Sequence, residues 1–223
     1  MKNIKLLLVL FVMAFTISEH KAYSCPDGWQ EISFDASYIY DYGGGQFQCD
    51  FRIVYCCGWD EVNQQRVIML KWVSPIYLSC FLYLPNWDNF LGWLHRVTYQ
   101  HAEANCYTDL PSCDDTNHIV YKILFIRSDC IYYENWQPYW GDDFVMRIVF
   151  CNYAYFKCTY KVCYDFSSSP PTKRTIFLSM ESEPPSCPQE EPQVPPPGKT
   201  WDQHWITHCF LKRLPTCPNL DNQ

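Results

Sequence analysis

The sequence lacks the motifs by which the commonest enzymes and metal-binding proteins are known. It has no Gly-x-Ser-x-Gly elbow, no phosphate-binding glycine loop and no His-Glu-x-x-His pair. It also has no Cys-x-x-Cys, the spacing typical of structural zinc sites and of thioredoxin-like redox centres. We therefore expect a protein that is not an enzyme and that binds no metal or cofactor.

An excess of basic residues is also missing, and so is any long apolar run beyond the start of the chain. The formal net charge is −7, and without residues 1–24 the chain has 14 Lys and Arg against 23 Asp and Glu. An acidic chain has no general attraction for nucleic acid or for anionic membrane surfaces. The longest later candidates, such as residues 119–126, have the length of a strand and contain Lys122. We expect no nucleic-acid partner and no transmembrane span in the mature chain.

The first 24 residues have the pattern of a secretory signal peptide. Lys2 and Lys5 precede an apolar run over residues 6–17, and a polar stretch and small residues lead to Cys25. The run of about a dozen residues is short of the ~20 that a membrane-spanning helix needs, which argues against the alternative of a membrane anchor. A lipid-anchored Cys25 is a second alternative, but the usual leucine three residues before it is absent. We expect cleavage after Ser24 and a secreted protein, located outside the cell, on its surface or in the periplasm.

Cysteine is abundant, and every cysteine follows residue 24. An even number of cysteines in an exported chain predicts a framework of up to seven disulfides, with zinc binding as the alternative; the pairing stays open. The fourteen candidates are Cys25, Cys49, Cys56, Cys57, Cys80, Cys106, Cys113, Cys130, Cys151, Cys158, Cys163, Cys187, Cys209 and Cys217. Neighbouring residues of a strand point to opposite faces, so Cys56 and Cys57 should form two separate bridges rather than one between themselves.

Most of the chain between residues 25 and 180 has the two-residue alternation of β-strands. Residues 32–41 and 49–57 alternate on either side of Gly43-Gly44-Gly45, which predicts a hairpin. Further strands are expected over residues 66–73, 76–84, 118–127, 130–134, 144–151, 153–166 and 174–180. The segment 51–57 resembles 146–152 (Phe-Arg-Ile-Val-Tyr-Cys-Cys and Met-Arg-Ile-Val-Phe-Cys-Asn), which either a duplicated hairpin or convergent strand composition would explain.

One helix interrupts the strands. Asn86 can cap it, and apolar residues then recur at helical spacing from Trp87 to His101, before a loop over residues 106–113. Residues 181–200 are rich in proline and predict an extended linker, and residues 201–223 form a tail too short to fold without a disulfide staple. That staple is either Cys209–Cys217 or a bridge to the body. The fold class we predict is a mainly β antiparallel sandwich or open barrel over residues 25–180, with one helix.

Aromatic residues make up 18% of the chain and suggest the one binding site that the sequence offers. Tyr133, Trp136, Tyr139 and Trp140 lie in a run that also contains carboxylate and amide groups, a mixture that suits stacking on sugars. The alternative is that these rings fold inward and cover a sheet.

Histidines and paired carboxylates are weaker candidates. His204 and His208 are four apart and would share a face of a tail helix, and His95, His101 and His118 are possible general bases. Burial or solvation explains each of them more simply, as it does the Asp114-Asp115 and Asp142-Asp143 pairs.

The cysteine rhythm, the proline-rich stretch and the terminal segment Trp205-Ile-Thr-His-Cys-Phe210 resemble uncharacterised cysteine-rich exported proteins of bacteria. The resemblance implies export and brings no known activity. We predict a secreted or cell-surface protein with a structural or adhesive role. The alternatives are a carbohydrate-binding module and a secreted hydrolase, so an extracellular glycan and a second copy of the chain are the expected partners.

Overall fold

The computed structural model describes residues 24–42, 44–77, 80, 86–106, 110–114, 122–137, 143–212 and 216–220. The predicted signal peptide lies outside this part of the chain, apart from Ser24. Within it, the predicted fold class is confirmed, because the chain is mainly β with one long helix and a sheet that does not close.

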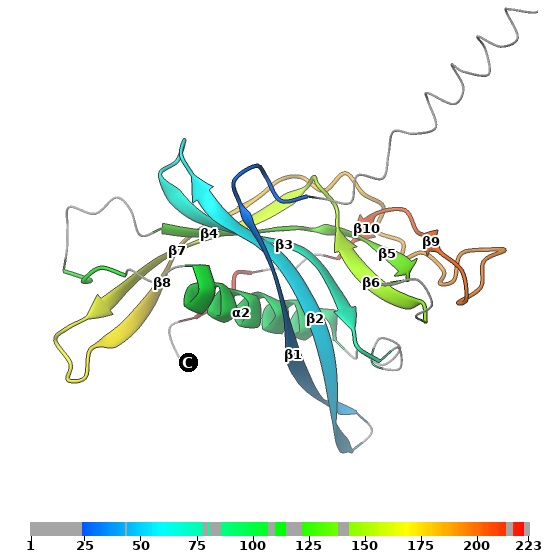
Figure 1. Cartoon of the computed structure of the whole chain (residues 1–223), viewed down its shortest axis with the longest axis horizontal. Helices are drawn as coiled ribbons and strands as arrows, with labels where there is room; N and C mark the ends of the chain where they lie inside the picture. Colours follow the sequence, from blue (N-terminus) through cyan, green and yellow to red (C-terminus); the bar gives the residue numbers. More distant parts are fainter. Residues whose placement is uncertain are drawn as a thin grey trace, which may run out of the picture.

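In the part of the chain that the structure describes, ten strands form the sheet and α2 covers one of its faces (Figure 1). The bounds are β1 Gln30–Tyr42, β2 Gly45–Asp60, β3 Gln65–Pro75, α2 Trp87–Cys106, β4 Lys122–Ser128, β5 Cys130–Trp136, β6 Val145–Phe150, β7 Tyr155–Asp165, β8 Thr172–Ser182, β9 Trp205–Ile206 and β10 Phe210–Leu211. In the segment 76–84, where a strand was expected, Ile76 and Tyr77 lie in a bend, and of the rest only Cys80 is described.

Strand β3 is the centre of the sheet. It pairs with β2 along one edge, and along the other it pairs first with β4 and then with β6. Between named strands, the β3–β4 pair is parallel and the others are antiparallel. The sheet therefore has three arms: β2–β1, β6–β5 with β9 and β10, and β4–β7–β8, which ends at β8 (Figure 1).

Two of these arms are equivalent hairpins on opposite sides of β3. Ile53 and Ile148, which correspond in the two similar segments, both pair with Val73. The likeness also extends to the partner strands, because Arg52 forms an ion pair with Asp35 of β1 and Arg147 forms one with Glu134 of β5. This shared register favours a duplicated hairpin over convergent strand composition as the explanation of the similar segments.

Helix α2 begins where the sequence predicts. The Asn86 side-chain oxygen accepts hydrogen bonds from the backbone N–H groups of Asp88 (2.9 Å) and Asn89 (3.1 Å), two of the donors that a helix start leaves without a partner. The helix packs on the sheet through an apolar stripe that includes Phe90 and Leu94, both fully buried. Burial of such a side chain contributes roughly 1.5–3 kcal/mol, so the stripe holds the helix against the sheet.

Alternation in the strands separates a helix-facing side from an outer side. In β2, Phe51, Ile53 and Tyr55 join the main core under α2. Among the described residues, the outer side has two small apolar clusters, one of which joins Val67 to Trp29. The sheet therefore packs against a helix on one face and presents a partly polar face on the other.

Seven disulfides join all fourteen cysteines. The pairs are Cys25–Cys56, Cys49–Cys80, Cys57–Cys106, Cys113–Cys163, Cys130–Cys187, Cys151–Cys209 and Cys158–Cys217. Cys56 and Cys57 form two separate bridges, as their opposite directions in the strand predict. The bridge to Cys56 occupies the sulfur of Cys25 that a lipid anchor would need.

The proline-rich segment and the tail lie against the body. Residues 183–200 contain no helix or strand, but Cys187 is bonded to β5 through Cys130, and Val194 packs on the main core. The tail is held by two bridges to the body, the second of the two arrangements considered for it, and β9 and β10 extend the edge of β5. Trp205 and Phe210 are buried there, so the tail completes the core.

Candidate functional site: the outer aromatic cluster and the edge strand β8

Of the four predicted sugar-binding residues, the structure describes Tyr133 and Trp136, and these two point to opposite faces of β5. Tyr133 lies on the helix-facing side of β5 with 2% of its surface exposed, and its ring centroid is 4.9 Å from that of Phe210. Its hydroxyl donates a hydrogen bond to Glu191, and burial raises the pKa of Tyr133. Tyr133 is therefore not available to a ligand at the surface. Tyr139 and Trp140 lie outside the described residues.

Trp136 points to the outer side of β5 and belongs to what we call the outer aromatic cluster, formed with Trp72, Arg147 and Glu134. The two indole rings meet edge to face, with centroids 5.9 Å apart. The Arg147 guanidinium carbon lies 4.1 Å from the Trp136 centroid and 5.0 Å from the Trp72 centroid, within the range of a cation–π interaction. Its Nε and Nη2 donate to Oε2 of Glu134 at 3.0 and 2.9 Å.

The contacts of this cluster are those of a structural element that joins strands and tail. Arginine lies over both rings, which makes the ring faces it covers unavailable for stacking on a sugar, while Glu134 holds the guanidinium in place. The other Glu134 oxygen lies 3.2 Å from Nε2 of His204, so the cluster also ties the tail to the sheet. A sugar site formed by Trp136 with Tyr139 and Trp140 stays a prediction.

The candidate histidines make contacts typical of packed side chains. His95 is fully buried and stacks on Phe125 with centroids 3.7 Å apart; its Nε2 is 3.2 Å from the hydroxyl of Tyr160. Burial, reinforced by the positive charges of Arg127 and Arg96, holds the pKa of His95 well below its usual value.

His101 lies nearer the surface but is packed in a similar way. It stacks on Phe34 with centroids 3.9 Å apart, its Nδ1 is 3.0 Å from the hydroxyl of Tyr55, and partial burial lowers its pKa. His118 lies outside the described residues. His95 and His101 are therefore both packed against aromatic neighbours.

His204 and His208 flank a strand rather than lie on a helix, so the shared face expected of a tail helix does not form. His208 is exposed, and His204 contacts Glu134. Among the residues that the structure describes, no group of three or more His, Cys, Asp or Glu is placed to hold a metal ion. Within the same residues, no helix has both the length and the apolar character that a membrane crossing demands.

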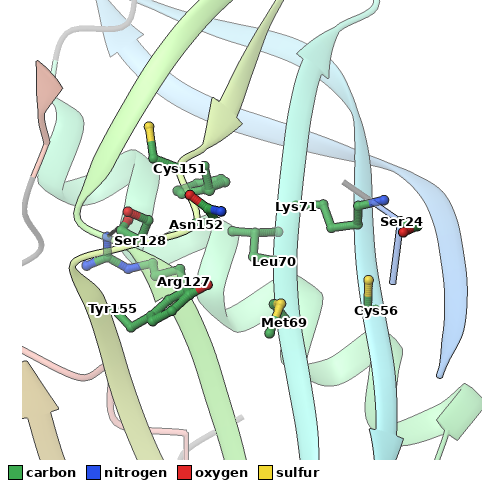
Figure 2. A pocket seen from close by; sticks show the side chains of 11 residues that line it. Ser24, Cys56, Met69, Leu70, Lys71, Arg127, Ser128, Cys151, Asn152 and Tyr155 are labelled. Carbon is green, nitrogen blue, oxygen red and sulfur yellow. Dashed lines mark hydrogen bonds between the residues drawn. The ribbon is translucent and has the colours of Figure 1, made fainter. Parts of the chain in front are cut away.

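A small cavity lies among side chains of β3, β4, β6 and β7 (Figure 2). Met69, Lys71, Arg127 and Tyr155 are among the side chains that line it. Its volume of about 40 Å³ is close to that of one water molecule and far below the roughly 300 Å³ of ligand pockets. The cavity is therefore too small for a substrate or cofactor.

Strand β8 is the surface that the sequence analysis missed. It has eleven residues and pairs with β7 on one side, and no other strand of the described chain pairs with its second side. Four apolar side chains of β8 are 39–48% exposed: Ile176, Phe177, Leu178 and Met180. Ile176 pairs with Lys161 and Phe177 with Tyr160, so the exposed apolar groups occupy both faces of the sheet.

A groove runs beside β8. Its lining comes from residues 174–177 on one side and from residues 217–219 on the other, and its volume is about 460 Å³. The second wall exists because the Cys158–Cys217 bridge holds the tail next to β7. The sequence holds one signal of this strand's unusual exposure. In the run Thr-Ile-Phe-Leu-Ser-Met, three consecutive residues are apolar, whereas a half-buried strand alternates apolar and polar residues.

No protein-family model, no curated protein and no solved structure matches this chain.

Proposed function

We propose that the protein acts outside the cell, without catalysis, as a structural or adhesive protein whose contact surface is the edge strand β8. Seven disulfides are typical of an extracellular protein, since cytosolic thiols are kept reduced. The sequence separations run from 31 to 59 residues, and in the chain-entropy model a bridge of that span stabilises the folded state by about 4 kcal/mol. A body braced in this way would resist unfolding and proteolysis while it is held at a surface.

The observation that carries the proposal is the exposure of β8. An edge strand presents a row of backbone N–H and C=O groups to an added strand, and folded proteins usually protect such edges with charge, proline, a β-bulge or a very short strand. In β8 the middle is instead apolar, and the irregularity opposite Thr159 and Tyr160 adds Leu178 rather than a charged residue. Strand addition to such an edge is a common way in which proteins recognise one another.

The other long edge strand is protected in the usual way. Strand β1 pairs with β2 alone among the described strands, but its outer face carries Glu31, Ser33, Asp35 and Ser37 ahead of the one exposed apolar residue of that described face, Ile39. Glu31 and Asp35 are held in ion pairs with Lys71 and Arg52. Of the two edges, β8 is therefore the one suited to contact.

The test is the retention of the protein on cells that export it. Replacement of both Ile176 and Phe177 by threonine keeps the β propensity of the strand but removes much of its exposed apolar surface. We expect surface retention and cell–cell aggregation, measured by flow cytometry and microscopy with an epitope tag, to fall several-fold.

The matched control replaces Ile39 and Phe47 by threonine in the β1–β2 hairpin, where the two side chains are 56% and 48% exposed. This change removes similar apolar surface and should leave retention intact. Equal loss in both variants, or wild-type protein that remains dispersed in the medium, contradicts the proposal.

A further inference from the structure

We propose that the partner of β8 is β8 of a second copy, paired antiparallel about a twofold axis so that two sheets become one. This inference rests on the proposed function, in which β8 is the contact surface, and names the molecule that occupies it. A twofold contact uses the same surface on both copies, so the strand must be complementary to itself.

The charges of β8 meet that requirement. Lys173 and Arg174 lie at its start and Glu181 at its end, followed directly by Glu183. Antiparallel pairing places the basic end of each copy opposite the acidic end of the other, whereas parallel pairing would place like charges together. Lys173 and Arg174 are 40% and 48% exposed, so their charges can face an added strand although each also forms an ion pair within the chain, with Glu103 and Asp165.

The apolar residues lie between these charged ends. Ile176, Phe177 and Leu178 occupy the middle of the strand, so rotation about a twofold axis near Phe177 places the apolar centre of one copy against that of the other. Cross-strand pairs of aromatic and β-branched residues are among those that stabilise a sheet. The groove between residues 174–177 and residues 217–219 leaves room on the helix side for side chains of the added strand.

Strand β1, the other long edge strand, lacks this self-complementarity of charge. Its charged residues are Glu31, Asp35 and Asp41, all acidic, so two copies of β1 would place negative charges together. The opposite signs at the two ends of β8 thus distinguish it from the other long edge and favour a second copy over an unrelated partner.

The experiment reverses the charge of Arg174 in one variant and of Glu181 in another, and then mixes the two variants. Arg174→Glu gives positions 174 and 181 acidic side chains, and Glu181→Arg gives both positions basic side chains. By analytical ultracentrifugation of the mature, oxidised protein, we expect wild type to dimerise and each variant alone to bind itself at least about tenfold more weakly, because like charges then lie opposite one another. An equimolar mixture of the two variants should recover the dimer, as should the double variant in one chain.

Arg52→Glu is the matched control, since it makes the same change of charge at a residue that is 54% exposed on β2. It should leave dimerisation unchanged. Monomeric wild type at high concentration, or a mixture that does not recover the dimer, overturns the antiparallel pairing of copies. If that happens while the Ile176 and Phe177 substitutions still reduce surface retention, β8 contacts a different molecule and the proposed function stands; if retention is also unaffected, both fail.

Discussion

His95 shows at the scale of a single residue how the core constrains chemistry. Its ring is fully buried between Phe125 and Tyr160, and the Tyr160 hydroxyl donates a hydrogen bond to the carbonyl of Pro218 in the tail. The neutral form of the ring is favoured in this place, because burial and the positive charges of Arg127 and Arg96 hold the pKa of His95 well below its usual value. The residue therefore helps to join helix, sheet and tail rather than to transfer protons.

The protonation of His95 predicts a loss of stability at mildly acidic pH. The pKa is lowered in the folded state and is about 6.5 in the unfolded chain, so below that pH the unfolded state binds more protons and stability falls as the pH falls. His101, whose pKa is also lowered, acts in the same direction. We expect the free energy of unfolding in urea to decrease between pH 7 and pH 5, with at most about 1.4 kcal/mol per pH unit from one histidine.

Substitution of His95 by phenylalanine should reduce this slope. The quantity compared is the change in the free energy of unfolding per pH unit. A loss of packing that lowers stability equally at every pH does not change it. An unchanged slope in a variant that keeps the wild-type disulfide pattern would show that His95 titrates normally.

At the scale of elements, the start of α2 is the feature that the sequence predicted most closely. Replacement of Asn86 by alanine leaves two backbone donors without their acceptor and should lower the free energy of unfolding by about 1 kcal/mol. Asn89→Ala is the matched control, since that side chain is exposed in the first turn and is not the cap. Equal effects of the two substitutions in chemical denaturation would argue against the cap.

Local pattern explains why some elements were predictable and others were not. The alternation on each side of Gly44 and the period after Asn86 are local consequences of burial on one face, so the hairpin and the helix could be read directly. The position of β8 at the end of the sheet depends on the pairing of β4 with β3 and of β7 with β4, which no local pattern contains. The same limit applies to the site: Tyr133 and Trp136 were both candidates, but only the register of β5 decides that one faces the core.

In the whole molecule, three disulfides fix the proline-rich segment and the tail to the sheet. Cys187 is bonded to Cys130 of β5, Cys209 to Cys151 directly after β6, and Cys217 to Cys158 of β7. One stretch of about thirty residues is therefore fixed to two of the three arms of the sheet. The proline-rich composition of residues 181–200 predicted an extended conformation but not this attachment, because cysteine pairing cannot be deduced from spacing. The attached tail also forms one wall of the groove beside β8. The proposed contact surface therefore depends on the Cys158–Cys217 bridge.

A disulfide map of the exported protein tests whether the tail is fixed to the body. Free thiols are alkylated under denaturing conditions, and peptides prepared without reduction are then identified by mass spectrometry. We expect no alkylated cysteine and the seven pairs given above, with Cys187, Cys209 and Cys217 linked to Cys130, Cys151 and Cys158 respectively. Several reactive thiols, or a Cys209–Cys217 pair that leaves the tail detached, would contradict the braced extracellular body on which the proposed contact through β8 depends.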